Sequence, residues 1–424
     1  MSRWAITAER MWDGTADRAV ESQAVVIDGA AIVAVIPKAE LPPGIPVRAF
    51  PGATLLPGLI DAHVHYSAAM GPAFLAAGVT TIRDVGNDLD WILEQRARHA
   101  AEPACGPTIV CCGHLLDGPQ AIWKHMGRPH RDAEALRASV REEVARGVDA
   151  IKFYAGLDLD MLAAGVAEAR AQRHWSLAHL GAVTAEDAAR VGLNEIQHLT
   201  GCAPAWKAST VDEQDALIDV LLEHQVVMTP TLVVWDRLGG LGDLAFFHDE
   251  RRAWVHPCHR AIWDRYRVAQ ADRHCYQSAM AHVKSCLARM QARGLTLALG
   301  TDAPFPHLIP GFSVHDELAM YVDAGIAPVA ALRSATSIGA RVLGVAAARA
   351  GRLVPGMQAD LLVVAGNPLE DIRDIRHVAC TVRAGRVFER QELAGKMAQA
   401  ARHDADGAVT SDLCRYTGAK PVHD

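Results

Sequence analysis

The sequence lacks the long apolar runs that a membrane protein needs. Runs such as Ala24–Ile36, which contains Asp28, are too short to span a bilayer. The N-terminus carries Arg3, Glu9 and Arg10 without an apolar stretch, so we expect no signal peptide. Together these absences predict a chain with no membrane partner.

The sequence also lacks a disulfide framework and an excess of positive charge. Its nine Cys are an odd number, no C-x-x-C occurs, and Cys111 and Cys112 are adjacent. Free thiols in the cytoplasm are the expected state. Lys and Arg number 42 against 49 Asp and Glu, giving a net charge of -7. Such a chain is a poor match for a phosphate backbone, so we expect no nucleic-acid partner.

Half of the residues are hydrophobic, which is enough for a large core, and their patterning changes along the chain. Residues 1–56 and 351–390 contain short β-segments separated by turns, and they predict one small discontinuous β-sandwich domain. Residues 57–350 alternate strands with helices, which predicts an α/β fold of the (β/α)8 TIM-barrel type. A helical insertion at about 238–293 interrupts this unit. Residues 391–424 predict a surface helix and a loose tail.

The expected barrel strands are each short and apolar. They are the strand ending in His63-Val64-His65, then Gly78–Asp84, Thr108–Cys112, Val148–Tyr154, Trp175–His179, Asn194–His198, Val226–Met228 and Leu295–Thr301. A helix is expected over Asp132–Arg146, where Asp132 can cap the first turn.

Polar side chains stand at the ends of several of these strands. His63 and His65 are two apart, so on a strand both imidazoles project from the same face. Lys152, His179, His198 and Asp302 follow at later strand ends. Barrel active sites are built at the carboxyl ends of the strands. Four His and one Asp converging there predict a site for first-row metal ions.

Lys152 is the unusual member of this group, because an ammonium cannot bind a cation. A lysine that captures carbon dioxide as a carbamate (N6-carboxylysine) becomes an anionic oxygen ligand. Such a group can bridge two ions about 3.5–4 Å apart. The alternative is a lysine paired with a carboxylate.

These motifs resemble the amidohydrolase superfamily, and within it the binuclear branch that includes imidazolonepropionase-like proteins and metal-dependent Xaa-Pro dipeptidases (prolidases). The resemblance covers residues from about 5 to 390. It is carried by Pro57-Gly58-Leu-Ile-Asp-Ala-His-Val-His65, Gly78-Val-Thr-Thr-Ile-Arg-Asp84, Ile151-Lys-Phe-Tyr154, Ala178-His179, Ile196-Gln-His198, Gly300-Thr-Asp302 and Gly351–Asp360.

The resemblance implies a ligand set for two divalent metal ions. His63, His65 and Asp302 would hold the more buried ion, and His179 and His198 the second. A carboxylated Lys152 and a hydroxide would bridge the two. Imidazole and carboxylate ligands suit zinc and are also compatible with Mn, Fe or Co.

The same resemblance implies a metal-dependent hydrolase in which the bridging hydroxide attacks a carbonyl and Asp302 passes its proton to the leaving group. The expected substrate is a small molecule with an amide bond, such as a dipeptide or N-acyl amino acid. A lactone, ester, carbamate or cyclic amide is the alternative for the same site. A mononuclear deaminase and a non-catalytic scaffold are further alternatives, and a homo-oligomer is compatible with the large surface helices.

Candidate substrate-binding residues lie on the strand ends and loops around this site. The amino-acid sequence of the Gly113–Gly127 loop differs from the one usual in the family. The first loop, residues 66–77, is shorter than in prolidase-like relatives. Both departures leave the substrate open. The candidates are Tyr154, His114, His125, Arg128, Trp235 and His307.

Overall fold

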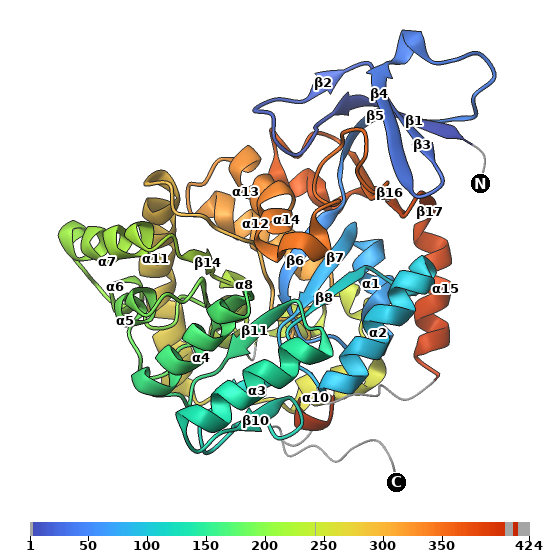
Figure 1. The fold of residues 1–424 in the computed structure, drawn as a ribbon. Coiled ribbons are helices and arrows are strands. Elements are labelled where there is room, and N and C mark those ends of the chain that lie inside the picture. Colours follow the sequence, from blue (N-terminus) through green and yellow to red (C-terminus); the bar gives the residue numbers. More distant parts are fainter. Residues whose placement is uncertain (1–2, 242, 403–409, 414–424) are drawn as a thin grey trace.

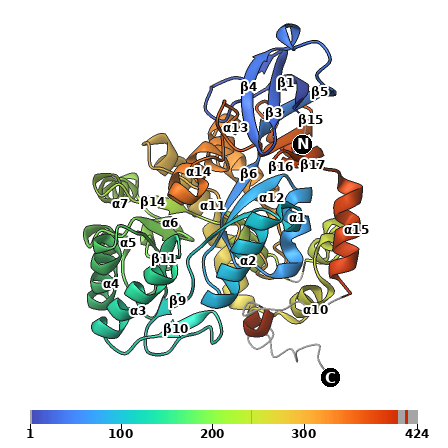
Figure 2. The same cartoon turned by 45° about the vertical axis from the view of Figure 1, so that its right-hand side comes forward.

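The structure is a computed structural model that describes residues 3–241, 243–402 and 410–413 (Figure 1). A sheet containing the first strands of the chain lies above a larger body in which helices surround shorter strands (Figure 1). The turned view shows α15 along one side of this body, next to α1 (Figure 2).

One sheet of eight strands is built from both ends of the chain. Its order is β17-β16-β15-β5-β1-β3-β4, and β2 pairs with β1. The strands are β1 (Trp4–Met11), β2 (Val20–Glu21), β3 (Gln23–Asp28), β4 (Ala31–Pro37), β5 (Val47–Pro57), β15 (Leu361–Ala365), β16 (Val378–Arg383) and β17 (Arg386–Phe388).

The predicted β-sandwich appears instead as this single sheet in the described residues. The physical reason is the length of β5, whose 11 residues pair with β1 on one edge and with β15 on the other. Leu361 of β15 lies opposite Pro57 of β5. Strands from the two ends of the chain therefore attach to the same central strand, while the domain boundaries stay a prediction.

Two parallel sheets form the larger body, as expected for an α/β fold. One has the order β6-β7-β8, and the other β10-β9-β11-β12-β13-β14. Their strands are β6 (Leu59–Val64), β7 (Val79–Asp84), β8 (Thr108–Cys111), β9 (Leu115–Asp117), β10 (Gly127–Pro129), β11 (Ala150–Phe153), β12 (Trp175–Ala178), β13 (Glu195–Gln197) and β14 (Val227–Thr229).

The segment predicted as the eighth strand joins these two sheets by isolated contacts. Leu297 bridges to Met228 of β14, and Ala303 bridges to Val64 of β6. The backbone N–H groups of both Thr301 and Asp302 donate to the His63 carbonyl, at 3.2 and 2.7 Å. Because two successive donors share one acceptor, a regular ladder cannot continue here. A closed barrel is accordingly not found in the described part of the chain.

Helices cover the parallel sheets and begin at conventional caps. Asp132 caps α3 by accepting from the Ala135 N–H at 2.8 Å, as predicted, and Thr210 and Glu213 form a capping box at α7. The helices are α1 (Gly71–Ala76), α2 (Leu89–Ala101), α3 (Ala133–Arg146), α4 (Leu159–Ala171), α5 (Ala185–Arg190), α6 (Ala203–Trp206), α7 (Val211–Glu223), α8 (Leu232–Gly239), α9 (Leu244–Phe247), α10 (Pro257–Arg265), α11 (Gln270–Ala292), α12 (Phe312–Asp323), α13 (Pro328–Ser334), α14 (Ser337–Leu343) and α15 (Arg390–Ala400).

The 3-10 helices connect these elements. They are η1 (Lys38–Glu40), η2 (Ala68–Met70), η3 (Pro103–Cys105), η4 (Glu250–Trp254), η5 (Gly344–Ala347) and η6 (Ile372–Arg376).

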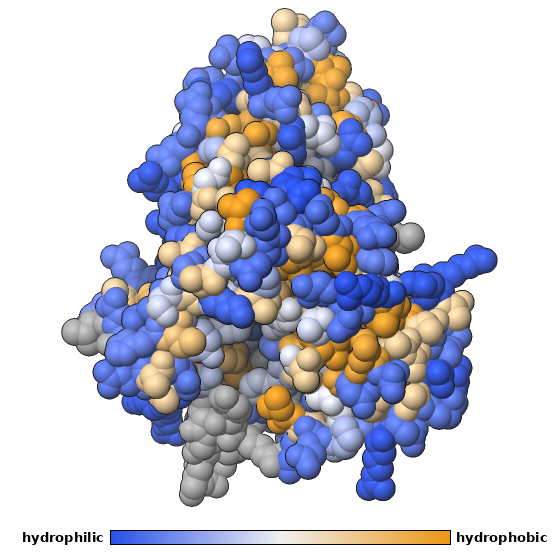
Figure 3. All heavy atoms as spheres, turned by 90° about the vertical axis from the view of Figure 1, so that its left-hand side faces the viewer, coloured by the Kyte–Doolittle hydropathy of each residue, from blue (hydrophilic) through white to orange (hydrophobic). Residues whose placement is uncertain are grey.

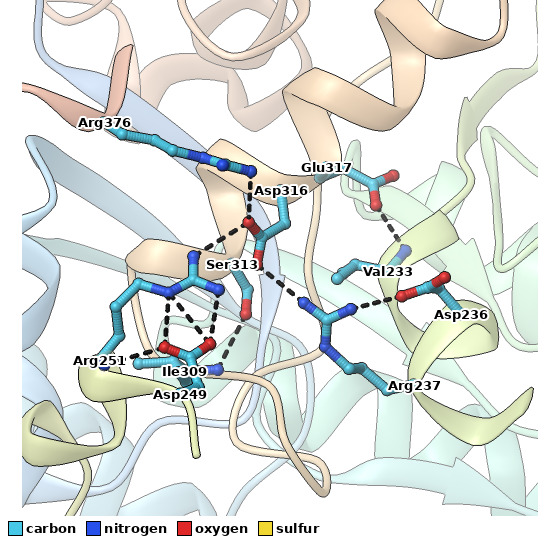
Figure 4. A network of polar contacts seen from close by, with 10 residues as sticks. All are labelled: Val233, Asp236, Arg237, Asp249, Arg251, Ile309, Ser313, Asp316, Glu317 and Arg376. Carbon is cyan, nitrogen blue, oxygen red and sulfur yellow. Dashed lines mark hydrogen bonds and ion pairs between the residues drawn. The ribbon is translucent and has the colours of Figure 1, made fainter. Parts of the chain in front are cut away.

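A polar network anchors the start of the predicted insertion to α12 (Figure 4). The Asp316 carboxylate accepts from Arg237 of α8 at 2.8 Å, from Arg251 of η4 at 3.0 Å and from Arg376 of η6 at 3.1 Å. The neighbouring Glu317 accepts from the first two backbone N–H groups of α8, at 2.8 Å from Leu232 and at 2.7 Å from Val233. Figure 4 draws the contact with Val233. These contacts satisfy donors that a helix start leaves unpaired, and they fix α8 beside the strand ends.

The surface and the helices agree with the absence of long apolar runs. On the face drawn in Figure 3, hydrophobic residues occur in small groups among hydrophilic ones. Among the described residues no helix, including the 23-residue α11, is both long and apolar enough to cross a bilayer.

Candidate metal centre

Six polar side chains meet in one cavity of about 430 Å³. β6 carries His63 and leads to His65, and β11 carries Lys152. His179 and His198 directly follow β12 and β13, and Asp302 follows the segment that bridges the two sheets. All six residues predicted from the strand ends line this cavity: His63, His65, Lys152, His179, His198 and Asp302.

The ring nitrogens and the carboxylate converge at short range. Nε2 of His63 lies 3.2 Å, and Nε2 of His65 3.3 Å, from Oδ1 of Asp302. The His63 and His198 ring centroids are 4.4 Å apart, and those of His179 and His198 are 4.9 Å apart. Ligand atoms of His63, His198 and Asp302 all lie within 4.8 Å of one another.

Hydrogen bonds on the far side of three rings orient them, and for His63 and His65, whose partners are carbonyl oxygens, they also set the tautomer. Nδ1 of His63 faces Oε1 of Gln197, and Nδ1 of His65 faces the Gly86 carbonyl at 2.9 Å. Nδ1 of His198 lies 2.6 Å from Oγ1 of Thr231. An Nδ1 that donates leaves Nε2 with a free lone pair directed into the cavity. Nε2 of His65 then faces a carboxylate oxygen, so a proton or a cation must lie between the two acceptors.

Burial keeps most of these imidazoles in the neutral form that binds metals. Burial and then the charge of Lys152 lower the pKa of His63 to about 4 and that of His179 to about 3. Burial and then His63 lower the pKa of His198 well below its usual value. Burial alone would raise the pKa of Asp302, but His63 and the other surrounding imidazoles hold it well below its ordinary range. Neutral imidazoles around an ionised carboxylate are a donor set for a divalent cation.

Lys152 supports the same interpretation. Its side chain is 1% exposed, and its Nζ has no hydrogen-bond partner among the described residues. Burial lowers the pKa of Lys152 to about 7. A buried ammonium without a partner is unfavourable. The neutral amine is the form that reacts with carbon dioxide, so the carbamate predicted from the sequence fits this position.

A buried chain of hydrogen-bonded polar groups orients the His63 ring through its Nδ1, on the side that faces away from Asp302. Arg83 pairs with both oxygens of Glu195, with Nη1 donating to Oε2 at 2.8 Å. Nε2 of Gln197 donates to Oε1 of Glu195 at 2.6 Å. This donation turns Oε1 of Gln197 toward His63, whose Nδ1 therefore carries the proton.

Aromatic side chains form much of the cavity wall. Tyr154 lines the cavity, its ring centroid lies 5.0 Å from that of His179, and its Oη accepts from Nε1 of Trp123 at 2.8 Å. Trp235 of α8 also lines it, 6.1 Å from the His198 ring. Nε1 of Trp235 is buried and has no hydrogen-bond partner among the described residues. Tyr154 and Trp235 were both predicted as substrate contacts, and both line the cavity that holds the six polar side chains.

Four other predicted substrate residues do not line this cavity. Nδ1 of His114 pairs with Glu143 at 2.7 Å, and Arg128 pairs with Glu142 at 2.7 Å. His125 binds Asp412 through its backbone N–H. His307 packs against aromatic rings of α9 and α10. Their geometry gives their predicted substrate role no support: His114, His125, Arg128 and His307.

Several wall residues were not predicted from the sequence. The helical insertion supplies the largest group of them, and Leu413 comes from the region predicted as a loose tail. No spacing signal marked these residues, because they come from loops and helix ends placed by long-range packing. The insertion residues are Tyr266, Arg267, Val268, Ala269, Asp272 and Tyr276.

Comparison with known protein families identifies the family to which the chain belongs. The model of the amidohydrolase family matches residues 54–388, and the chain belongs to this family. This confirms the resemblance carried by the strand-end motifs. Amidohydrolases are metal-dependent hydrolases, and the cluster of His63, His198 and Asp302 provides a candidate metal site of the expected kind.

Similar proteins include one uncharacterised relative and one named enzyme. An uncharacterized protein of Mycobacterium tuberculosis (strain ATCC 25618 / H37Rv) is 25% identical over 367 residues, which cover 80% of this chain and 86% of that protein. The ochratoxinase of Aspergillus niger is 32% identical over 115 residues, 26% of this chain and 23% of that enzyme.

Solved structures share the fold over nearly the whole chain. A Xaa-Pro dipeptidase with bound methionine aligns with a TM-score of 0.72 and 21% identity, covering 92% of this chain and 100% of that one. A bottromycin amidohydrolase aligns with a TM-score of 0.74 and 21% identity, covering 94% and 90%. At these identities the likeness concerns the fold.

Proposed function

We propose that the protein is a binuclear metal hydrolase that cleaves the amide bond of a small substrate such as a dipeptide or N-acyl amino acid. The observation that carries this proposal is the buried Lys152, which has no hydrogen-bond partner within the described residues and lies in the same cavity as four His and Asp302. Neighbours named as a prolidase, an ochratoxinase and an amidohydrolase support amide hydrolysis. We regard the two parallel sheets and their bridging segment as an interrupted (β/α)8 barrel.

The six residues divide into ligands for two ions, which we expect to be zinc. His63, His65 and Asp302 would hold the more buried ion. His179 and His198 would hold the second, with carboxylated Lys152 between the two. When bound, the ions lower the pKa of water in the site and polarise a substrate carbonyl.

Asp302 is the proposed proton carrier. It is the only carboxylate among the six residues, and its low pKa keeps it ionised and able to accept a proton from the attacking water. Bound between the His side chains, it can then donate that proton to the leaving nitrogen as the tetrahedral intermediate collapses. Tyr154 and Nε1 of Trp235 are placed to donate hydrogen bonds to substrate oxygens.

The proposal is tested with Asp302→Asn, which keeps the shape of the side chain and removes its basicity. We expect hydrolysis of dipeptides and N-acyl amino acids to fall by several orders of magnitude in a variant that still holds metal. Substantial turnover by fully metallated Asp302→Asn would refute the proton-transfer role.

The same site can also act on a lactone, ester, carbamate or cyclic amide. The short first loop, residues 66–77, supports this second candidate. Residues of the insertion, rather than residues of that loop, form much of the cavity wall. A substrate panel containing each bond type on a common acyl group separates the two candidates.

A further inference from the structure

The short C-terminal segment 410–413 packs against the mouth of the cavity. It lies beside α10, apart from α15, in both ribbon views (Figures 1 and 2). Asp412 and Leu413 are only 2% and 3% exposed. The prediction of a loose tail is therefore wrong for these four residues, because their side chains find partners that are distant in the sequence.

Asp412 holds one loop by its backbone. Its carboxylate accepts from the N–H groups of Lys124 at 3.0 Å, His125 at 2.9 Å and Met126 at 2.9 Å. Three consecutive amides thus converge on one side chain. Hydrogen bonds to a carboxylate are stronger than those between neutral groups, so this contact is well suited to fix an otherwise irregular loop.

The other end of the segment contacts the helical insertion. Oγ1 of Thr410 lies 3.0 Å from Nε2 of His259 in α10. Leu413 packs in a cluster with Leu115, Met126 and Ile262 of α10. The segment therefore joins the 122–126 loop to the insertion, and these are two sides of the cavity wall.

The 122–126 loop is connected to the proposed metal ligand His179 through two aromatic side chains, Trp123 and Tyr154. Trp123 lines the cavity and donates to Oη of Tyr154, which lies against His179. Leu413 lines the cavity directly. A shift of the loop would therefore act directly on the proposed substrate contacts, and on the proposed metal ligand His179 only through Tyr154.

We propose that residues 410–413 complete the substrate cavity, with Asp412 as a positioning residue for the 122–126 loop and Leu413 as a specificity-determining residue. The specificity role rests on the proposed amide hydrolysis. The substrate group that meets Leu413 is apolar, because Leu413, Met126 and Phe305 face the same part of the cavity.

The positioning role is tested by hydrogen exchange on the full-length chain. Asp412→Ala is compared with Ser411→Ala, a control in the same segment whose side chain is exposed. We expect Asp412→Ala to accelerate exchange of the amides of residues 124–126 at least about tenfold, because these donors lose their acceptor. Metal content per chain should stay at the wild-type value. Unchanged exchange at all three amides would overturn the positioning role.

The specificity role is tested with Leu413→Ala and Leu413→Trp on N-acetylglycine and N-acetylphenylalanine. We expect each variant to change the ratio of kcat/KM for the two substrates by about tenfold, mainly through KM, since the altered wall contacts only the larger side chain. Equal changes for both substrates would overturn this role. A fully metallated wild type that hydrolyses neither these substrates nor dipeptides would instead contradict the proposed function, while the exchange result would still decide the role of Asp412.

Discussion

The buried pair of Arg83 and Glu195 provides a quantitative test of how the site is supported. Arg83 is 1% exposed and Glu195 is fully buried. Burial would raise the pKa of Glu195, but Arg83 lowers it below its ordinary value, so the pair is charged. Glu195 also accepts from Trp175 at 2.8 Å and from Thr229 at 2.6 Å.

Glu195→Gln keeps the volume and removes the charge. Arg83 would then keep its bond from Nε to the Ala62 carbonyl, at 2.9 Å, and one acceptor oxygen of the new amide, but it would stay buried without a counter-ion. Breaking such a pair by removing one partner costs about 3–5 kcal/mol. Arg83→Met should cost a similar amount, since it leaves Glu195 as the unpaired charge. The double variant should cost about 2 kcal/mol less than the sum, because neither charge is then left alone.

The assay is urea unfolding followed by far-UV circular dichroism, with refolding checked for each variant. Arg190→Met is the matched control, because Arg190 and its partner Asp187 are both at the surface, and it should move the midpoint much less. The reasoning would be refuted by single variants whose unfolding free energies equal that of the wild type within experimental error. It would also be refuted by a double variant whose loss of unfolding free energy equals the sum of the two single losses.

Three further predictions follow from buried polar groups. Burial raises the pKa of Glu317 from 4.5 to about 8, so its contribution to stability is largest below pH 4.5 and declines as the pH rises toward 8; Glu317→Gln should flatten the unfolding free energy over that range, and an unchanged pH profile would contradict this. Gln197→Leu should weaken zinc binding about 10–100-fold in a chelator competition by freeing the His63 ring, and wild-type affinity would argue against the support chain. Asp316→Asn should lower the unfolding free energy by about 2 kcal/mol, because the buried Arg237 and the partly buried Arg251 each lose one of two carboxylate partners (Figure 4); a loss no larger than that of a surface pair would show that the network is dispensable.

The convergence of the six polar side chains was predictable because strand ends of parallel sheets share one edge. His63 lies on β6 and His65 just after it, Lys152 lies on β11, and His179 and His198 directly follow β12 and β13. Asp302 follows the segment that bridges the two sheets. Alternation also predicts which segments are strands, but it does not predict their partners. The single sheet around β5 could not be foreseen for this reason.

The residues of the cavity wall were harder to predict from the sequence than the six polar residues of the candidate metal site. Tyr154 directly follows β11, the strand that carries Lys152, and lies two residues after Lys152, so strand periodicity predicts its position. Loop charges such as Arg128 find carboxylates on neighbouring helices instead. Leu413 reaches the cavity through contacts between residues almost 300 positions apart, such as Asp412 with Lys124. No local pattern encodes such a pairing.

The number of metal ions per chain tests the central claim most directly. It should be measured by elemental analysis on protein purified without chelator, for the wild type and for Lys152→Ala. The proposal predicts close to two ions in the wild type and fewer in the variant, because Lys152 would bridge them. Close to one ion in both would contradict the bridging role and would favour a mononuclear deaminase or cyclic-amide hydrolase.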